Sequence, residues 1–228
     1  MDTVVRYLAS FLAVAVVLTL HEFAHAFAAY KCGDPTPKWN GRLSVNPLRH
    51  FDITGLICFA LVGFGWAKPV PINPYNFKKY RSGMAWTSVA GVLMNYLSAF
   101  LFYPLFMLVV RFVLPEWNNY FGVLLYYLTY FLFAYSLSFC VFNLLPLYPL
   151  DGFRLVEALD KRHGKVYMFL RRYGYYILLA LIFESFLCQL FVSFGIGQMH
   201  MFDILGYFMT FATGYLGWPV SELWGLVF

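Results

Sequence analysis

Two stretches of this chain contain no charged side chain over a length that crosses a lipid bilayer. Gly83 to Val110 is 28 residues without Lys, Arg, Asp or Glu, and Trp117 to Leu150 is 34. Each exceeds the roughly 20 residues that a membrane-spanning helix needs. Val4 to Tyr30 and Tyr173 to Phe194 are further apolar stretches with only two charges and one charge, respectively. A water-soluble domain would need a polar face on each stretch, so the sequence predicts an all-α polytopic membrane protein.

Two shorter apolar segments bring the expected number of membrane segments to about five or six. Residues 53–66 and 204–217 are 14 residues each, which is short for a span. We expect 53–66, which lies between two basic loops, to be re-entrant or shallow, and 204–217 to be a last span or an interfacial segment. Gly41 to Pro47 is either a short strand or an ordinary loop, so we expect a small membrane-associated β/loop region after the first helix.

The basic side chains lie in two groups. Eight of the sixteen Lys and Arg residues fall between Lys31 and Arg81, and six fall between Arg154 and Arg172. Basic residues beside membrane spans favour the cytoplasmic side, so we expect both groups to be cytoplasmic and the basic balance to reflect topology. No nucleic-acid partner is expected. The four cysteines are widely spaced without a CxxC pair, so we infer neither disulfides nor a cysteine metal site.

His21, Glu22 and His25 form an HExxH motif inside the first apolar stretch. On a helix the two histidines share a face, with the glutamate beside it, so two imidazoles can bind one zinc ion while the carboxylate reaches its water. Titratable groups within a membrane span are functional by default. Counted from Lys31, His25 and His21 should lie about 9 and 15 Å below the cytoplasmic end of the helix.

Catalytic zinc usually takes a third protein ligand. Asp151 follows Pro146 and Pro149, which break the helix at the end of an apolar stretch, and irregular backbone at membrane depth is tolerated where it lines a cavity. The alternative role for Asp151 is an N-cap of the following helix. Glu184, or the loop residues His50 and Asp52, are the other candidates. Depth favours Asp151 but does not decide the matter.

Two motifs together resemble the site-2 protease family of intramembrane zinc metalloproteases. They are His21 to His25 (HEFAH) and Asn143 to Gly152 (NLLPLYPLDG). Further matches occur in the family's order: Asn46 to Asp52, Gly65 to Asn73 (GWAKPVPIN), and Ala90-Gly91 with Asn95. The chain departs from the family at Val92 and Phe153, where proline and glycine are frequent. We expect these departures to alter helix entry rather than catalysis, and the chain to resemble a short form without a PDZ or CBS domain.

The resemblance implies a site and a function. His21, His25 and Asp151 would bind one Zn²⁺ ion, Glu22 would be the catalytic carboxylate, and Asn143 would contact the substrate or the developing oxyanion. The enzyme would hydrolyse peptide bonds of transmembrane-segment substrates near the cytoplasmic side. Residues 1–228 would form one membrane-embedded metalloprotease domain, with a catalytic core at about 4–160 and additional membrane segments at about 165–228.

Partners and alternatives follow from the same features. The expected partners are the lipid bilayer and a membrane protein with a transmembrane helix, and the expected location is the plasma membrane; the sequence does not set the oligomeric state. A metal-ion transporter would also place His and Asp in a membrane, but with polar residues along several spans. A non-catalytic membrane-embedded regulator would be expected to lose Glu22. Asn95 is predicted to be a helix–helix contact rather than a catalytic group.

Overall fold

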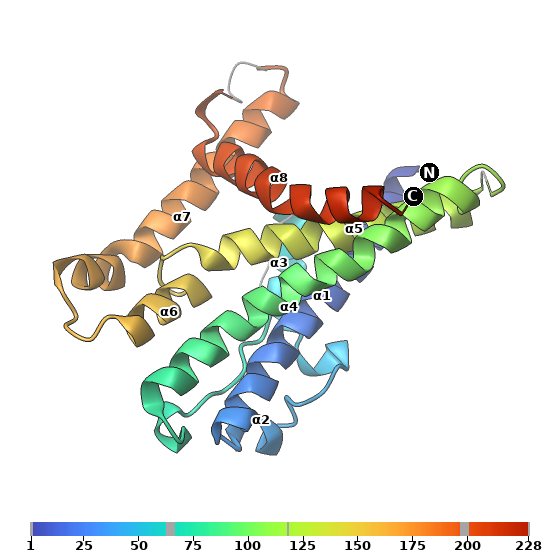
Figure 1. The fold of residues 1–228 in the computed structure, drawn as a ribbon. Helices are drawn as coiled ribbons and strands as arrows, with labels where there is room; N and C mark the ends of the chain where they lie inside the picture. The colour runs from blue at the N-terminus through green and yellow to red at the C-terminus, as the bar shows by residue number, and fades with distance from the viewer. Residues whose placement is uncertain (1, 63–66, 118, 197–200, 228) are drawn as a thin grey trace.

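The computed structural model describes the chain except residues 1, 63–66, 118, 197–200 and 228. It is almost entirely helical, as predicted (Figure 1). Within the described residues, four helical segments are long and apolar enough to cross a membrane: Thr3–Cys32, Tyr80–Val113, Tyr120–Leu144 and Lys165–Ser193. The all-α membrane fold is therefore confirmed, whereas the count of five to six membrane segments is not.

Three long helices form the core. Helix α1 (Asp2–Cys32), α4 (Tyr80–Leu108) and α5 (Tyr120–Leu144) pack against one another. Small residues of α1, including Ala9, Ala13 and Val17, are fully buried, because they let the neighbouring helices approach closely. Aromatic side chains of α5 pack against them. The helix that carries the HExxH motif is therefore held on two sides.

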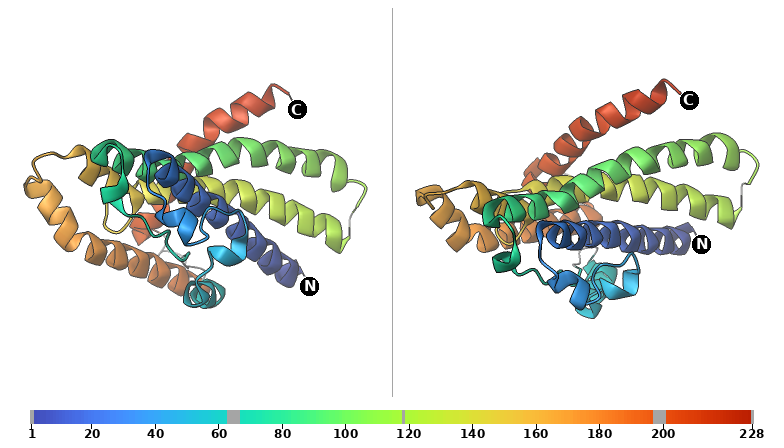
Figure 2. Two further views of the ribbon diagram at one scale, coloured as in Figure 1. Left: turned by 90° about the horizontal axis from the view of Figure 1, so that it is seen from below. Right: turned by 60° about the horizontal axis from the view of Figure 1, so that its bottom comes forward.

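The segment between α1 and α4 lies beside α1, outside this core (Figure 2). It contains the short helices α2 (Thr36–Trp39) and α3 (Ile53–Val62). With ten residues, α3 is about 15 Å long, half the thickness of a bilayer core. The end of the predicted segment 53–66 lies outside the described residues.

Of the two alternatives for Gly41–Pro47, the structure shows the loop and not the strand. These residues have no regular pairing, and a single bridge, Phe51 to Ala67, is the strand-like contact among the described residues. Local bonds take up the backbone instead, since the Asn46 side chain accepts from Leu48 N–H and the Ser44 hydroxyl accepts from Asn46 N–H. Pro47, which has no N–H, begins a turn of 3-10 helix.

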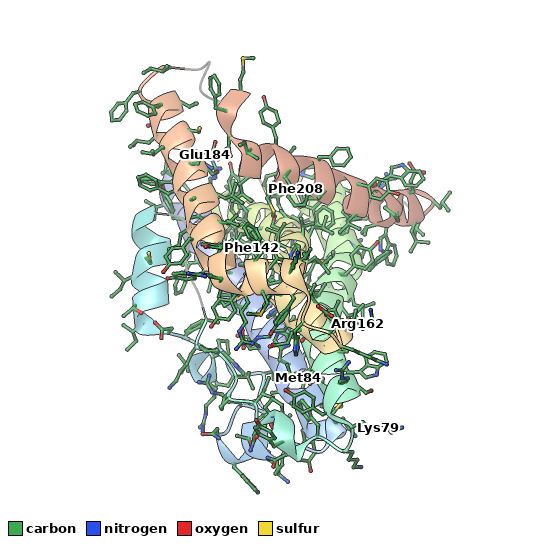
Figure 3. All side chains as sticks on the ribbon, turned by 90° about the vertical axis from the view of Figure 1, so that its left-hand side faces the viewer. Lys79, Met84, Phe142, Arg162, Glu184 and Phe208 are labelled. Atoms are coloured by element: carbon green, nitrogen blue, oxygen red, sulfur yellow. The ribbon has the colours of Figure 1, made fainter. Side chains whose placement is uncertain are left out.

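The remaining helices surround one side of the core. The nine-residue α6 (Asp151–Leu159) follows α5, α7 (Lys165–Ser193) stands away from the core, and α8 (Ile204–Gly225) returns across α5 (Figure 1). Although α8 has 22 residues, it is not one of the four candidate spans. Lys79 and Arg162, from the two basic regions, lie towards the lower part of the molecule and Glu184 lies near the top (Figure 3).

Candidate metal centre

Helix α1 presents both histidines of the motif on one buried face. His21 is 5% exposed and His25 is 4% exposed, and their Nε2 atoms lie 2.9 Å apart. The spacing of four residues brings the rings together because such residues are neighbours along a helix. The two imidazoles therefore converge on one point, as the sequence predicts.

Asp151 reaches the same point from another part of the chain. Its Oδ2 lies 2.9 Å from His25 Nε2 and 3.2 Å from His21 Nε2. Leu150 occupies the N-cap position and Asp151 is the first residue of α6, so the alternative role of helix N-cap is wrong. The next residue, Gly152, permits this placement: a Cβ there would lie 2.3 Å from the carbonyl oxygen of Leu144.

The three side chains could hold a metal ion, and they are the one such group of His, Cys, Asp or Glu within the described residues. Zinc binds nitrogen and oxygen at about 2.0–2.2 Å, so ligands at the corners of a tetrahedron lie about 3.3 Å apart. The observed separations of 2.9–3.2 Å are close to this value. The donor set of two imidazoles and one carboxylate also suits zinc.

A cavity of about 140 Å³ opens beside these side chains. Glu22, one residue after the first histidine, projects into it, and its Oε2 accepts a hydrogen bond of 3.3 Å from Val70 N–H. The lining combines charged groups from α1 and α6 with apolar groups from two loops: His21, Glu22, His25, Pro69, Val70, Ile72, Asn143, Pro149, Leu150, Asp151 and Arg154. The cavity is large enough for several water molecules.

Asn143 lines this cavity, but one of its amide hydrogens is already used. Its Nδ2 donates to the carbonyl oxygen of Phe139, 3.1 Å away on the preceding turn of α5. An amide nitrogen carries two hydrogens, so one remains for a ligand. The structure thus places Asn143 in the cavity lining, with its side-chain hydrogen bond directed to Phe139.

Arg154 was not predicted as part of the site. The sequence places it in the basic group that is expected to mark the cytoplasmic boundary. In the structure it lines the cavity, with its Nη1 4.0 Å from Asp151 Oδ1. The available signal was its spacing, because residues three apart on a helix face the same side. Its partly exposed guanidinium supplies positive charge at the cavity wall.

Helix α4 lies against the two histidines and contacts the Nδ1 atom of each ring. Asn95 is fully buried with its amide 3.0 Å from His21 Nδ1, and His25 Nδ1–H donates to the backbone oxygen of Thr87 at 2.7 Å. Between them lies Gly91, where a Cβ would be 2.4 Å from His25 Nε2. Asn95 does join two helices, as predicted, but its partner is a candidate metal ligand.

The segment from Lys68 to Asn73 (KPVPIN) forms one wall of the cavity. Its first end is held by Lys68 N–H, which donates to His50 O at 2.8 Å, and its last end by Asn73 N–H, which donates to Asp34 at 2.7 Å. Burial alone would raise the pKa of the Asp34 carboxyl, but hydrogen bonds from Thr36, Asn76 and Asn73 lower it below its usual value. Sequence reasoning did not identify Asp34 as this anchor.

The other candidates for a third ligand lie elsewhere. His50 donates from Nε2 to the Ser44 carbonyl oxygen at 2.7 Å, and Asp52 accepts from Gly55 N–H. Glu184 accepts from Ile204 N–H at the start of α8. Gly65 and Trp66 of the GWAKPVPIN match lie outside the described residues.

The comparisons with known proteins show similarity to peptidases. Residues 113–184 match the model of peptidase family M50, a segment that includes Asn143 and Asp151. A Bacillus subtilis (strain 168) protein named "Putative zinc metalloprotease YwhC" is 40% identical over 144 residues, which are 63% of this chain and 65% of that protein. The chain thus covers slightly less than two thirds of this relative's length. No solved structure matches the chain. Its resemblance to the site-2 protease family is therefore confirmed through peptidase family M50.

Proposed function

We propose that this protein is a zinc-dependent intramembrane endopeptidase. The observation that carries the proposal is the convergence of His21, His25 and Asp151, with Glu22 beside them in a cavity. The family match and the name of the relative support the same chemistry. A role limited to binding or transporting a metal ion would not require a carboxylate in the position of Glu22.

The candidate residues divide the chemistry between them. One zinc ion, held by His21, His25 and Asp151, would supply a Lewis acid that makes water acidic enough to ionise near neutral pH. Glu22 accepts the proton of the attacking water and delivers it to the leaving amine. The free amide hydrogen of Asn143 donates to the oxyanion that develops on the carbonyl.

The substrate is a transmembrane helix of another membrane protein. The cavity is lined by residues of membrane helix α1 and by the chain between α5 and α6, so a lipid-embedded segment can approach it. Peptide carbonyls in a helix are occupied by hydrogen bonds, so the segment must unwind locally before hydrolysis. We infer that the site faces the cytoplasm at the plasma membrane, because both basic regions favour that side.

The test is the substitution Glu22→Gln in purified full-length protein. The variant should keep stoichiometric zinc and lose at least 100-fold in the rate of cleavage of a transmembrane peptide, as expected when a general base is removed. Glu184→Gln is a matched control, because it removes a carboxylate that hydrogen-bonds to Ile204 N–H at the start of α8. Cleavage at the original rate by Glu22→Gln would refute the proposal.

Identification of the substrate uses the same variant. A protein that binds but does not cleave should retain its membrane substrate during detergent extraction, and the Asp151→Ala protein provides the background for comparison. A transmembrane protein enriched by Glu22→Gln over that background would be the substrate. Equal recovery from both proteins would contradict stable capture by this site.

A further inference from the structure

Helix α4 supplies a hydrogen-bond partner to each candidate metal-binding histidine. Thr87, Gly91 and Asn95 are spaced by four residues and therefore lie on one face of the helix. The outer ring nitrogen of His25 contacts the Thr87 backbone, and the outer ring nitrogen of His21 contacts the Asn95 side chain. The partner is thus a main-chain group in one case and a side chain in the other.

The contact with Thr87 sets the tautomer of His25. A backbone carbonyl oxygen can only accept, so the hydrogen in this 2.7 Å bond belongs to His25 Nδ1. A neutral imidazole carries one hydrogen, which leaves the lone pair on Nε2. That lone pair faces the shared point between the ligands, which is the arrangement that a metal requires.

To bind a metal through Nε2, His21 also needs its ring hydrogen on Nδ1. The Asn95 side chain can accept that hydrogen in one of its two amide orientations. As placed, its Nδ2 lies 3.0 Å from His21 Nδ1 while its Oδ1 is buried without a partner. If Nδ2 donates, His21 Nδ1 must be the acceptor, and the ring hydrogen sits on Nε2, where it blocks a metal. If the amide is turned by 180°, Oδ1 accepts the hydrogen of Nδ1 and Nε2 is free.

Burial alone does not choose between these orientations, because each leaves one end of the amide without a partner. The two ends have nearly the same shape, so the hydrogen-bond network has to decide. With a cation on Nε2 the hydrogen of His21 must be on Nδ1, and two facing donors at 3.0 Å would repel. Metal binding therefore selects the orientation in which Oδ1 accepts.

We propose that Asn95 is a positioning residue that holds His21 in the metal-binding tautomer by accepting a hydrogen bond from Nδ1–H. The inference rests on the proposed zinc site and adds a residue to it. Outer partners of metal-bound histidines typically contribute 10–100-fold to metal affinity. Asn95 is 0% exposed, so no water can replace the lost acceptor easily.

The test compares zinc affinity among variants of full-length protein in detergent, all in the Glu22→Gln background so that proteolysis plays no part. Asn95→Ala removes the acceptor and should weaken zinc binding 10–100-fold. Asn95→Asp can only accept when ionised, so it should keep the affinity within about threefold and keep the visible spectrum of the cobalt-substituted protein. Thr87→Val is the matched control and should bind zinc normally, because His25 uses the backbone of residue 87.

Two results would overturn the proposal. One is normal affinity in Asn95→Ala. The other is an Asn95→Asp protein that binds zinc as weakly as Asn95→Ala, because the amide would then act as a donor. Failure of the unsubstituted chain to bind zinc would instead contradict the proposed function itself. Melting temperatures of all variants separate a lost ligand partner from a lost fold, and Asn95→Asp keeps the comparison decisive if Asn95→Ala does not fold.

Discussion

Substitution of Gly91 by alanine should disrupt the candidate metal centre without changing any of its ligands. Gly91 lies on α4 directly against the two rings. A Cβ there would be 2.4 Å from His25 Nε2, 2.6 Å from His21 Cε1 and 2.7 Å from His25 Cε1, whereas ordinary contacts begin at 3.4 Å. The added methyl group must therefore displace either the rings or α4 by about 1 Å, since packed interiors have little free space.

That displacement is large compared with the tolerance of a metal site. Zinc–ligand distances vary by only about 0.2 Å among functional sites, so a shift of about 1 Å in His25 Nε2 removes it as a ligand. We expect at least a 100-fold loss of zinc affinity, which corresponds to about 2.7 kcal/mol. Proteolysis should fall in parallel.

The assay measures zinc bound per protein after equilibration with a competing chelator, together with cleavage of a transmembrane peptide. Gly214→Ala is the matched control: Gly214 also lies within a helix, α8, but a Cβ there meets nothing within 4 Å. That variant should bind zinc normally, and any gain in stability would reflect the better helix propensity of alanine. If Gly91→Ala bound zinc as tightly as the original protein, the close approach of α4 would have no role in forming the site.

Three further outcomes are expected. Gly152→Ala should lower both the melting temperature and zinc occupancy, because the added Cβ would lie 2.3 Å from the backbone oxygen of Leu144 and displace Asp151. Normal values of both quantities would show that the start of α6 can move. Asp34→Asn should lower the melting temperature at pH 7, because the pKa of the Asp34 carboxyl is lower in the folded protein than its usual value. The ionised carboxylate therefore stabilises the fold fully above about pH 4. That contribution disappears as pH falls further, so thermal scans of the two proteins should converge at low pH, and a constant difference would contradict the sign. Removal of metal by a chelator should abolish peptide cleavage and zinc should restore it, whereas full activity in the chelator-treated, metal-free protein would exclude the proposed chemistry.

The parts of the site that sequence predicted are those with a local pattern. His21, Glu22 and His25 lie within five consecutive residues, and the 3.6-residue period of the helix places the three side chains near one another. The break at Pro146 and Pro149 made Asp151 one of several candidates, and the resemblance to the site-2 protease family implied its role as a ligand. At Gly41–Pro47 the sequence left a strand and a loop open for the converse reason, since strand pairing depends on a partner that no local pattern specifies.

The contacts that the sequence did not predict join segments far apart in the chain, with the exception of the contact of Arg154. Asn95 is 74 positions from its partner His21. Arg154 has the same charge as its neighbours in the basic group at the membrane boundary, so the sequence did not distinguish it as a partner of Asp151. Asp34 anchors Asn73, 39 positions away. The Asn95–His21 and Asp34–Asn73 pairs have no spacing that a periodic pattern could reveal, because a contact between segments depends on how helices pack and not on the period of either one.

The sequence by itself determined that the chain is a helical membrane protein and that α1 carries two histidines and a glutamate on adjoining faces. These properties follow from apolar length and helical period, which are local. Within the described residues, the tertiary structure brings Asp151, and neither Glu184 nor His50, into the group with the two histidines, because the break between α5 and α6 places its carboxylate beside their Nε2 atoms. It also decided that α4 lies against their outer nitrogens, since the absence of a side chain at Gly91 lets two helices approach closely enough to share a buried hydrogen bond.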